Sequence, residues 1–576
     1  MVSMADPVAF FLEPKHAVHR RYEALRAYFV DRLSVTEVSE RYEYTTNAFR
    51  VLCTRFRQGT LAPFFRDDPT SRKETHPSEV LKQDVLRLRK RGLSIYDISR
   101  QLELEGTPAS HQTIWTILDD AGIPRLPKRS AAGKRETTNL PLPVADIREL
   151  DLSSGQTLSC RAPLLFLFAP MLVQLGFDKL VRDARYPGSY MIPSPAYLRS
   201  ILTLKLLSYP RKIDVMPIAD DQGLGLFAGL NVLPKTTALS DYSYRVGPSP
   251  HRTLLSGLVK AKDRLGCYPE LSFNLDFHAI RHYGEKGLLE NNYVPRRSQS
   301  VSSILTSFAQ EIGSREIVYA NANLLKSEKS DEVLRFVDYW ERTTGKTPNE
   351  LVFDSRMTDR SGLAKLDKNG VCFLTLRERR KNELARISSL PKDDWQRVEL
   401  DIKDRKWRRP LIFDEKIEIP GYPKKIRQIS ALDLGREEPT ILLTNDTHRG
   451  ASTLLTRYAR RTLIENSIGE QVHFFHVDSL SSDVRIKVDL DIVLTVLASG
   501  LYRWLAGALK GFETATARLL WRTFLDRPGQ IRLSDDAALL CVRRFSQAPT
   551  LLESKVGRDP RPIPWLGNRV VRLKIL

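Results

Sequence analysis

Three acidic residues have the types and surroundings that a metal-dependent nuclease needs. Asp276 lies within an alternating stretch at 271–277 that predicts a strand, and Asp354 ends a short apolar stretch at 351–354. Glu465 lies in a stretch with helical periodicity. Two divalent ions such as Mg²⁺ or Mn²⁺ prefer carboxylate oxygens and can drive phosphodiester cleavage. We therefore expect Asp276, Asp354 and Glu465 to be catalytic residues that bind two Mg²⁺ (or Mn²⁺) ions.

Two residues before Glu465 are candidates for DNA contacts. Tyr458 and Arg461 precede it by seven and four positions, so one continuous helix would place all three on one stripe. A cation and a phenol there predict contacts with the phosphates of the cleaved strand. Tyr458 also suggests an alternative, a tyrosine recombinase that uses it as nucleophile. Such enzymes need a His-x-x-Arg pair, and none precedes Tyr458 in a helical context.

The composition indicates a large protein with a polyanionic partner. The 576 residues are 42% hydrophobic, which predicts several domains with sizeable cores. A formal charge of +20 favours nucleic acid or an acidic membrane as partner. The five scattered cysteines are typical of free thiols in a reducing cytosol. Charged residues interrupt the apolar stretch at 490–510, so we expect a buried helix, no membrane, and a cytoplasmic, nucleoid-associated protein.

The N-terminal region predicts two all-α helix-turn-helix domains. Residues 17–58 suggest three helices, with Ser34 and Glu37 spaced as a capping box. The third helix carries Arg50 and Arg55, which we expect to contact DNA in the major groove. Residues 78–122 repeat the plan, and a basic linker follows at 123–150. The alternative is that both are ordinary three-helix bundles that serve for protein contacts.

The strand pattern after residue 270 predicts an α/β core. Strands are expected at 271–277, 301–310, 315–321, 351–354 and 371–376, with a helix at 330–344. This is the order of an RNase H-like fold, in which the first and fourth strands are parallel neighbours. Asp276 and Asp354 would then be adjacent. Arg377 and Arg379, just past the fifth strand, are expected to contact DNA.

The predicted domains follow from these patterns. A separate β-rich insertion is expected at about 380–448, one long helix from Ser452 to Phe475, and a basic tail at the C-terminus. The expected domains are a helix-turn-helix domain at 1–70, a second one with the basic linker at 76–135, a helical platform at 145–265 and the catalytic domain at 266–576.

Five segments of the chain resemble, in order, bacterial DDE transposases of the insertion-sequence group with a Tyr-x2-Arg-x3-Glu-x6-Lys motif. They are LDFHAI at 275–280, the segment 351–379, TRYARRTLIEN at 456–466, and the segments 473–484 and 490–506. The resemblance implies an RNase H-like catalytic core with a β-rich insertion. It also implies cut-and-paste transposition by a homodimer or larger synaptic assembly that binds terminal inverted repeats and target DNA.

One position departs from the motif. Val472 stands where the resemblance places the lysine, and His473, Arg460 and Lys487 are the open alternatives for its role. The departure leaves room for a second interpretation, a catalytically weakened, domesticated transposase that acts as a DNA-binding regulator.

Overall fold

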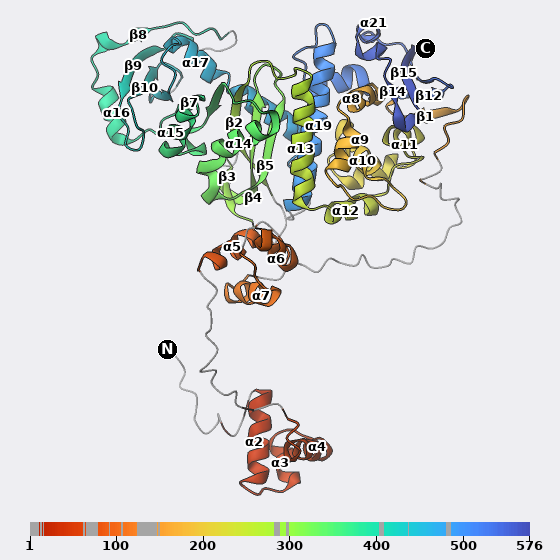
Figure 1. The fold of residues 1–576 in the computed structure, drawn as a ribbon, viewed down its shortest axis with the longest axis vertical. Coiled ribbons are helices and arrows are strands. Elements are labelled where there is room, and N and C mark those ends of the chain that lie inside the picture. The colour runs from red at the N-terminus through yellow and green to blue at the C-terminus, as the bar shows by residue number, and fades with distance from the viewer. Residues whose placement is uncertain are drawn as a thin grey trace. The chain divides into compact units, whose positions relative to one another are not determined.

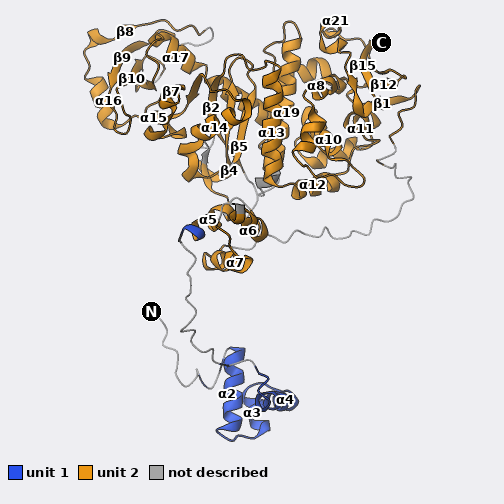
Figure 2. Ribbon diagram, viewed as in Figure 1, with its two compact units in different colours: residues 1–81 blue, residues 82–576 orange. Residues whose placement is uncertain are grey.

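The computed structural model divides into two compact units, residues 1–81 and 82–576 (Figure 2). The structure describes residues 11, 14, 16–61, 64, 79–90, 93–104, 107–123, 147, 150–281, 289–294, 299–402, 408–435, 437–479 and 485–576. The central part of the predicted basic linker, 124–146, lies outside these residues.

The first unit contains three short helices: α2 (Ala17–Phe29), α3 (Val35–Arg41) and α4 (Thr46–Arg57). The predicted capping box starts α3, because Glu37 N–H donates to Ser34 Oγ and Ser34 N–H donates to the Glu37 carboxylate. Phe49 is fully buried in the core that the three helices share. The three predicted helices are thus confirmed, and their role in DNA binding stays a prediction.

The second predicted set of three helices is also present: α5 (Glu79–Lys90), α6 (Ile95–Leu104) and α7 (His111–Asp120). Ser94 and Asp97 form the expected capping box before α6.

The segment 150–265 is mostly helical, as expected. Its elements are β1 (Thr157–Cys160), η1 (Pro163–Phe168), α8 (Ala169–Gln174), α9 (Phe177–Asp183), α10 (Ser194–Leu206), η2 (Lys212–Ile218), α11 (Gln222–Ala228), α12 (Thr236–Arg245) and α13 (Pro248–Arg264).

A ten-stranded sheet forms one side of the main body of the second unit, next to α13 and α19 (Figure 1). Its order is β3-β4-β2-β6-β7-β11-β10-β9-β8, and β5 pairs with β4. The five predicted strands are confirmed as β2 (Ser272–Arg281), β4 (Gln299–Glu311), β5 (Ile317–Leu324), β6 (Glu350–Phe353) and β7 (Cys372–Leu376).

The connections of this sheet follow the expected pattern. Helix α14 (Glu332–Thr344) joins β5 to β6, and α15 (Arg360–Lys368) joins β6 to β7. Strands β2, β4 and β5 are antiparallel neighbours, whereas β2, β6 and β7 are parallel. The predicted adjacency of the first and fourth strands is therefore correct.

The β-rich segment expected at about 380–448 is present but continues this sheet, so it is not separate from it; its interpretation as an insertion stays a prediction. Strand β11 (Thr440–Thr444) pairs antiparallel with β7, and β10 (Ile426–Leu432) and β9 (Leu411–Ile417) follow outward. The physical reason is that β7 would otherwise leave its outer backbone groups unpaired. The short strands β3 (Asn291–Val294) and β8 (Gln396–Arg397) lie at the ends of the path, and α16 (Lys381–Ser388) follows β7 in the chain.

The single helix predicted from Ser452 to Phe475 is in fact two helices. Helix α17 (Ala451–Ala459) ends before Arg460, and α18 (Thr462–His473) begins after Arg461. Around the break the backbone bonds span three residues instead of four, with Arg461 N–H donating to Tyr458 O at 2.9 Å. The predicted stripe therefore crosses a bend in the chain.

The C-terminal segment, expected to be a basic tail, forms a second sheet of order β1-β12-β13-β15-β14. Before it, α19 (Arg485–Ala508) packs against β5, α10 and α13 (Figure 1). The hydrophobic core is continuous across the predicted boundary at 265/266, and that division stays a prediction. The sheet and its neighbours comprise α20 (Ala517–Leu520), η7 (Trp521–Leu525), β12 (Gly529–Leu533), β13 (Ala537–Val542), α21 (Ala548–Glu553), β14 (Pro562–Ile563) and β15 (Arg569–Ile575).

Helix α19 is long and apolar enough to cross a membrane over Val488–Ala508. Within the structure, 83% of the apolar stretch of this helix is buried against other elements. Packing in the protein core therefore accounts for its apolar composition.

Candidate functional site

Two of the predicted carboxylates lie side by side where the pairing of the parallel strands β2 and β6 ends: Asp276 is in the middle of β2, and Asp354 directly follows β6. The register pairs Asn274 of β2 with Val352 of β6, so the next in-register position on the same face pairs Asp276 with Asp354. Asp354 keeps an extended backbone (φ −77°, ψ 150°), which continues the geometry of β6. Neighbouring strands are about 4.8 Å apart. The sheet thus sets the spacing between the two acids.

The third carboxylate, that of Glu465, is connected to Asp276 through Arg461. Arg461 Nη1 lies 3.1 Å from Asp276 Oδ2, and Arg461 Nη2 donates to Glu465 Oε1 at 2.7 Å. Asp276 and Arg461 are half-buried, whereas 47% of the Glu465 side chain is exposed. The guanidinium therefore bridges the strand-borne and the helix-borne acid.

Helices α17 and α18 are anchored to the sheet by buried contacts. Arg457 donates to Asn274 Oδ1 at 2.8 Å and to Ser272 Oγ at 2.9 Å, and it pairs with Glu350. On α18, Ile464 is fully buried, and Ser467 Oγ accepts a bond of 2.6 Å from a buried glutamine of β4. These contacts explain why Glu465 faces β2.

The site carries more negative than positive charge. Burial raises the pKa of Asp276, and the nearby Glu465 and Asp354 raise it further. Arg461 and the N–H of Phe277 act in the opposite direction without restoring the usual value. Three carboxylates face one guanidinium, and this is an arrangement that favours binding of additional cations.

The donor types fit hard divalent ions, because Mg²⁺ and Mn²⁺ are held by carboxylate oxygens and retain several waters. In the part of the chain that the structure describes, no three His, Cys, Asp or Glu side chains are close enough together to hold an ion. Arg461 occupies the space between Asp276 and Glu465. Ion binding by these acids therefore requires Arg461 to move.

Tyr458 lies on α17, behind Arg461. Its ring centroid is 5.9 Å from the guanidinium carbon, and burial raises the pKa of the phenol to about 12. A phenol with a raised pKa is a hydrogen-bond donor and a poor nucleophile. The environment of Tyr458 therefore argues against the recombinase alternative.

The other predicted DNA-binding arginines are not part of this cluster. Arg377 pairs with Glu383 at 2.7 Å, and Arg379 pairs with Glu438 at 2.8 Å. Arg377 also lines a cavity of about 590 Å³. Ser355, the residue after Asp354, lines the same cavity. Two more, Arg50 and Arg55, belong to the first unit, where both are exposed on α4.

Sequence reasoning missed Asp478. The residue lies 2.7 Å from His278 Nε2, and His278 follows Asp276 by two positions on the same face of β2. The two residues are 200 positions apart, so no local pattern could have indicated the pair.

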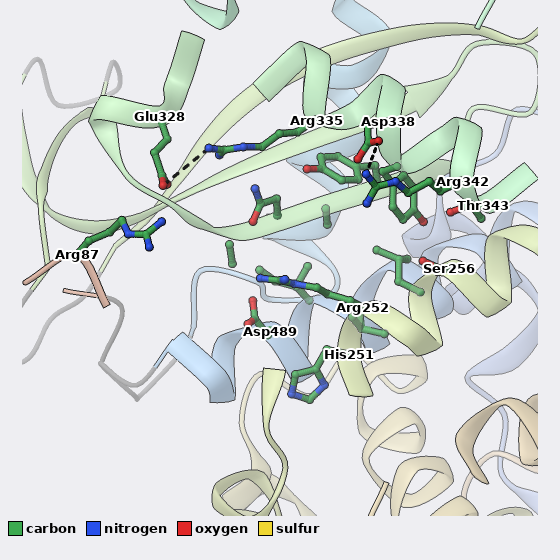
Figure 3. A pocket seen from close by; sticks show the side chains of 18 residues that line it. Arg87, His251, Arg252, Ser256, Glu328, Arg335, Asp338, Arg342, Thr343 and Asp489 are labelled. Atoms are coloured by element: carbon green, nitrogen blue, oxygen red, sulfur yellow. Dashed lines mark ion pairs between the residues drawn. The ribbon is translucent and has the colours of Figure 1, made fainter. Parts of the chain in front are cut away.

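A second cavity of about 490 Å³ lies between α13, α14, β5 and α19 (Figure 3). Two of its arginines are paired within it: Arg335 with Glu328 at 3.8 Å and Arg342 with Asp338 at 2.8 Å. Because these charges are already compensated, the cavity is a weaker candidate than the carboxylates of β2 and β6.

A scan against protein-family models and a search of curated proteins found no match to this chain.

Proposed function

We propose that this chain is a DDE-type DNA transposase with an RNase H-like catalytic core. The observation that carries the proposal is the in-register placement of Asp276 and Asp354 on parallel strands, with Glu465 linked to Asp276 through Arg461. One acid within a strand, one directly after the neighbouring strand and one on a helix can together supply carboxylate ligands for two-ion phosphodiester chemistry.

The topology of the sheet supports the proposal. The five strands β5-β4-β2-β6-β7 begin with an antiparallel meander and continue as parallel strands joined by helices. This is the strand order of an RNase H-like fold. The β-rich segment extends the same sheet, so its residues are continuous with the proposed core.

The chain's own side chains have separate tasks in the proposed reaction. Asp276, Asp354 and Glu465 would hold two Mg²⁺ (or Mn²⁺) ions, which supply a nucleophile and neutralise charge on the attacking and leaving oxygens. Arg461 would exchange its carboxylates for a DNA phosphate as the ions bind. Tyr458, protonated at neutral pH, would donate a hydrogen bond to the same strand.

The proposed partners are double-stranded DNA and further copies of the chain. The N-terminal helices, with Arg50 and Arg55, would bind the terminal inverted repeats of a mobile element. Arg377 and Arg379 would contact DNA after leaving their present acidic partners. The assembly would be a homodimer or larger, acting in the cytoplasm on the nucleoid.

The test is cleavage by the full-length protein. The substrate is a duplex that carries the inverted repeats found in the DNA flanking the coding region. We expect Mg²⁺-dependent nicking at the repeat ends, reduced at least about 1000-fold by Asp276→Asn and by Glu465→Gln, because each substitution removes an ion ligand. The matched control is Asp338→Asn, since Asp338 is an exposed acid on α14 whose partner, Arg342, is also exposed. Nicking that survives Glu465→Gln would contradict the site.

The second candidate function, a DNA-binding regulator, is favoured by one observation. Val472 packs against the hydrophobic core, so the position of the motif lysine carries no cation. A regulator would bind the repeats with the same affinity in the presence and absence of Mg²⁺ and leave them uncut. The cleavage assay separates the two functions directly.

A further inference from the structure

Three basic residues gather at the carboxyl end of the central sheet. Lys326 and Lys329 lie on η4 (Lys326–Asp331), and Arg356 lies on η5 (Ser355–Met357), directly after Asp354. The two short helices are in contact. Lys329 Nζ lies 5.6 Å from the ring centroid of Phe277, the residue that follows Asp276. We call Lys326, Lys329 and Arg356 the basic triad.

No ion pair compensates the basic triad within the described part of the chain. Burial lowers the pKa of Lys329, and repulsion from Lys326 and Arg356 lowers it further, while Glu290 opposes the shift weakly. The Glu290 carboxylate accepts a hydrogen bond of 2.9 Å from the backbone N–H of Lys326, and the three side-chain cations repel one another. Their persistence at the rim of the carboxylates indicates a site for an anion.

Other cations near the basic triad do form ion pairs with acids. Arg335 on α14 pairs with Glu328 and Glu332, and Lys346, just beyond the other end of α14, pairs with Asp263 at 2.7 Å. The basic triad differs from these neighbours, because Glu328, which lies between its two lysines on η4, pairs with Arg335 instead.

The position of the triad defines a path across the sheet edge. Asp276 faces α18 and Arg461, whereas Phe273, three positions before it, packs against Phe336 of α14. Because side chains alternate along a strand, Phe277 and the lysine above it lie on the α14 side. A DNA strand that passes from Arg461 over the carboxylates would meet the basic triad next.

We propose that Lys326, Lys329 and Arg356 form a binding site for one or two consecutive backbone phosphates of the DNA strand, on the α14 side of the carboxylates. This site would supply the cations that Val472 does not. The inference rests on the proposed function, because it takes DNA as the substrate of the adjacent acids.

The experiment measures DNA affinity of the full-length protein against salt concentration. A 40-base-pair duplex with a fluorescent label is titrated in Ca²⁺ buffer, and the dissociation constant is followed from low to high NaCl. Each neutralised phosphate contributes about 0.9 to the slope of log affinity against log salt. The triple substitution Lys326→Gln, Lys329→Gln, Arg356→Gln should lower the slope by about 1 to 2.

Two variants control this measurement. Lys346→Gln also removes a lysine beside α14, but one that an acid already compensates, and should leave the slope unchanged. The charge-conserving exchange Lys326→Arg, Lys329→Arg, Arg356→Lys should restore the slope, which separates lost charge from lost folding.

The outcomes distinguish this inference from the proposed function. An unchanged slope in a folded triple variant overturns the phosphate site, even when the wild type cuts DNA in a metal-dependent manner. A lowered slope in a protein that never cuts DNA supports the phosphate site and contradicts the transposase proposal. A wild type that binds no duplex overturns both.

Discussion

Two clusters of acids and arginines lie at opposite ends of the stretch over which the parallel strands β2 and β6 pair. At the start of β2 and β6, one acid, Glu350, forms ion pairs with two arginines, Arg457 and Arg449. It also accepts a hydrogen bond of 2.8 Å from Ser272 Oγ. Four residues further along, Asp276 and Asp354 lie next to each other. Together with Glu465 of α18 they are three acids near the single Arg461. Arg457 of the first cluster lies on α17, and Arg461 of the second cluster follows it at the break before α18.

The two clusters differ in charge balance, and the pKa values follow. Burial alone would raise the pKa of Glu350, but Arg457 and Arg449 outweigh it and the pKa falls. Burial raises the pKa of Asp276, and a single arginine does not overcome it. We expect the balanced cluster to stabilise the fold, and we propose that the acidic cluster binds cations from outside the chain.

Glu350→Gln should give the largest effect on stability. It keeps the shape of the side chain but leaves Arg457 buried without an opposite charge, so the free energy of unfolding should fall by about 3 kcal/mol. Urea denaturation followed by circular dichroism measures it. Asp276→Asn is the matched control from the other cluster and should cause no loss. Equal losses in both variants would remove the distinction between the clusters.

Arg461→Met should sharpen the comparison through metal binding. Removing the guanidinium frees Asp276 and Glu465 and deletes a repelling charge, so the Mn²⁺ affinity of the DNA-free protein should rise about tenfold. Calorimetry or electron paramagnetic resonance of bound Mn²⁺ measures this without any cleavage. Arg460→Met removes an exposed neighbouring charge and serves as control. Identical affinities in all three proteins would show that Arg461 does not compete with the ions.

The sequence predicted the strand-borne half of the site well. Alternation at 271–277 and the short apolar run at 351–354 located β2 and β6, and their order predicted the parallel pairing that aligns Asp276 with Asp354. Strand patterns are local, and a parallel crossover of this length leaves few choices of neighbour. For this reason two carboxylates could be placed together without any coordinates.

The helix-borne half could not be predicted in the same way. Periodicity at 458–465 indicated one helix, but the helix is interrupted at Arg460 and Arg461, just after Arg457, which tertiary contacts hold against β2. The contact of His278 with Asp478 depends on how α18 ends. Side chains brought together over such distances leave no spacing signal in the chain.

The smallest effect is expected in the pH dependence of stability of the metal-free protein, and it has opposite signs for the two clusters. The raised pKa of Asp276 means that its charged form costs stability, and this cost disappears as pH falls through the folded-state pKa. Asp276→Asn should therefore be more stable than the wild type at neutral pH, with a difference that shrinks on acidification. The lowered pKa of Glu350 means that its contribution is present above the usual glutamate range and lost below it. The penalty of Glu350→Gln should consequently also shrink in acid, but from the destabilised side. Urea unfolding of both variants at several pH values from neutral to acidic measures the two trends, and a shared sign would contradict the assignment of one cluster to folding and the other to cation binding.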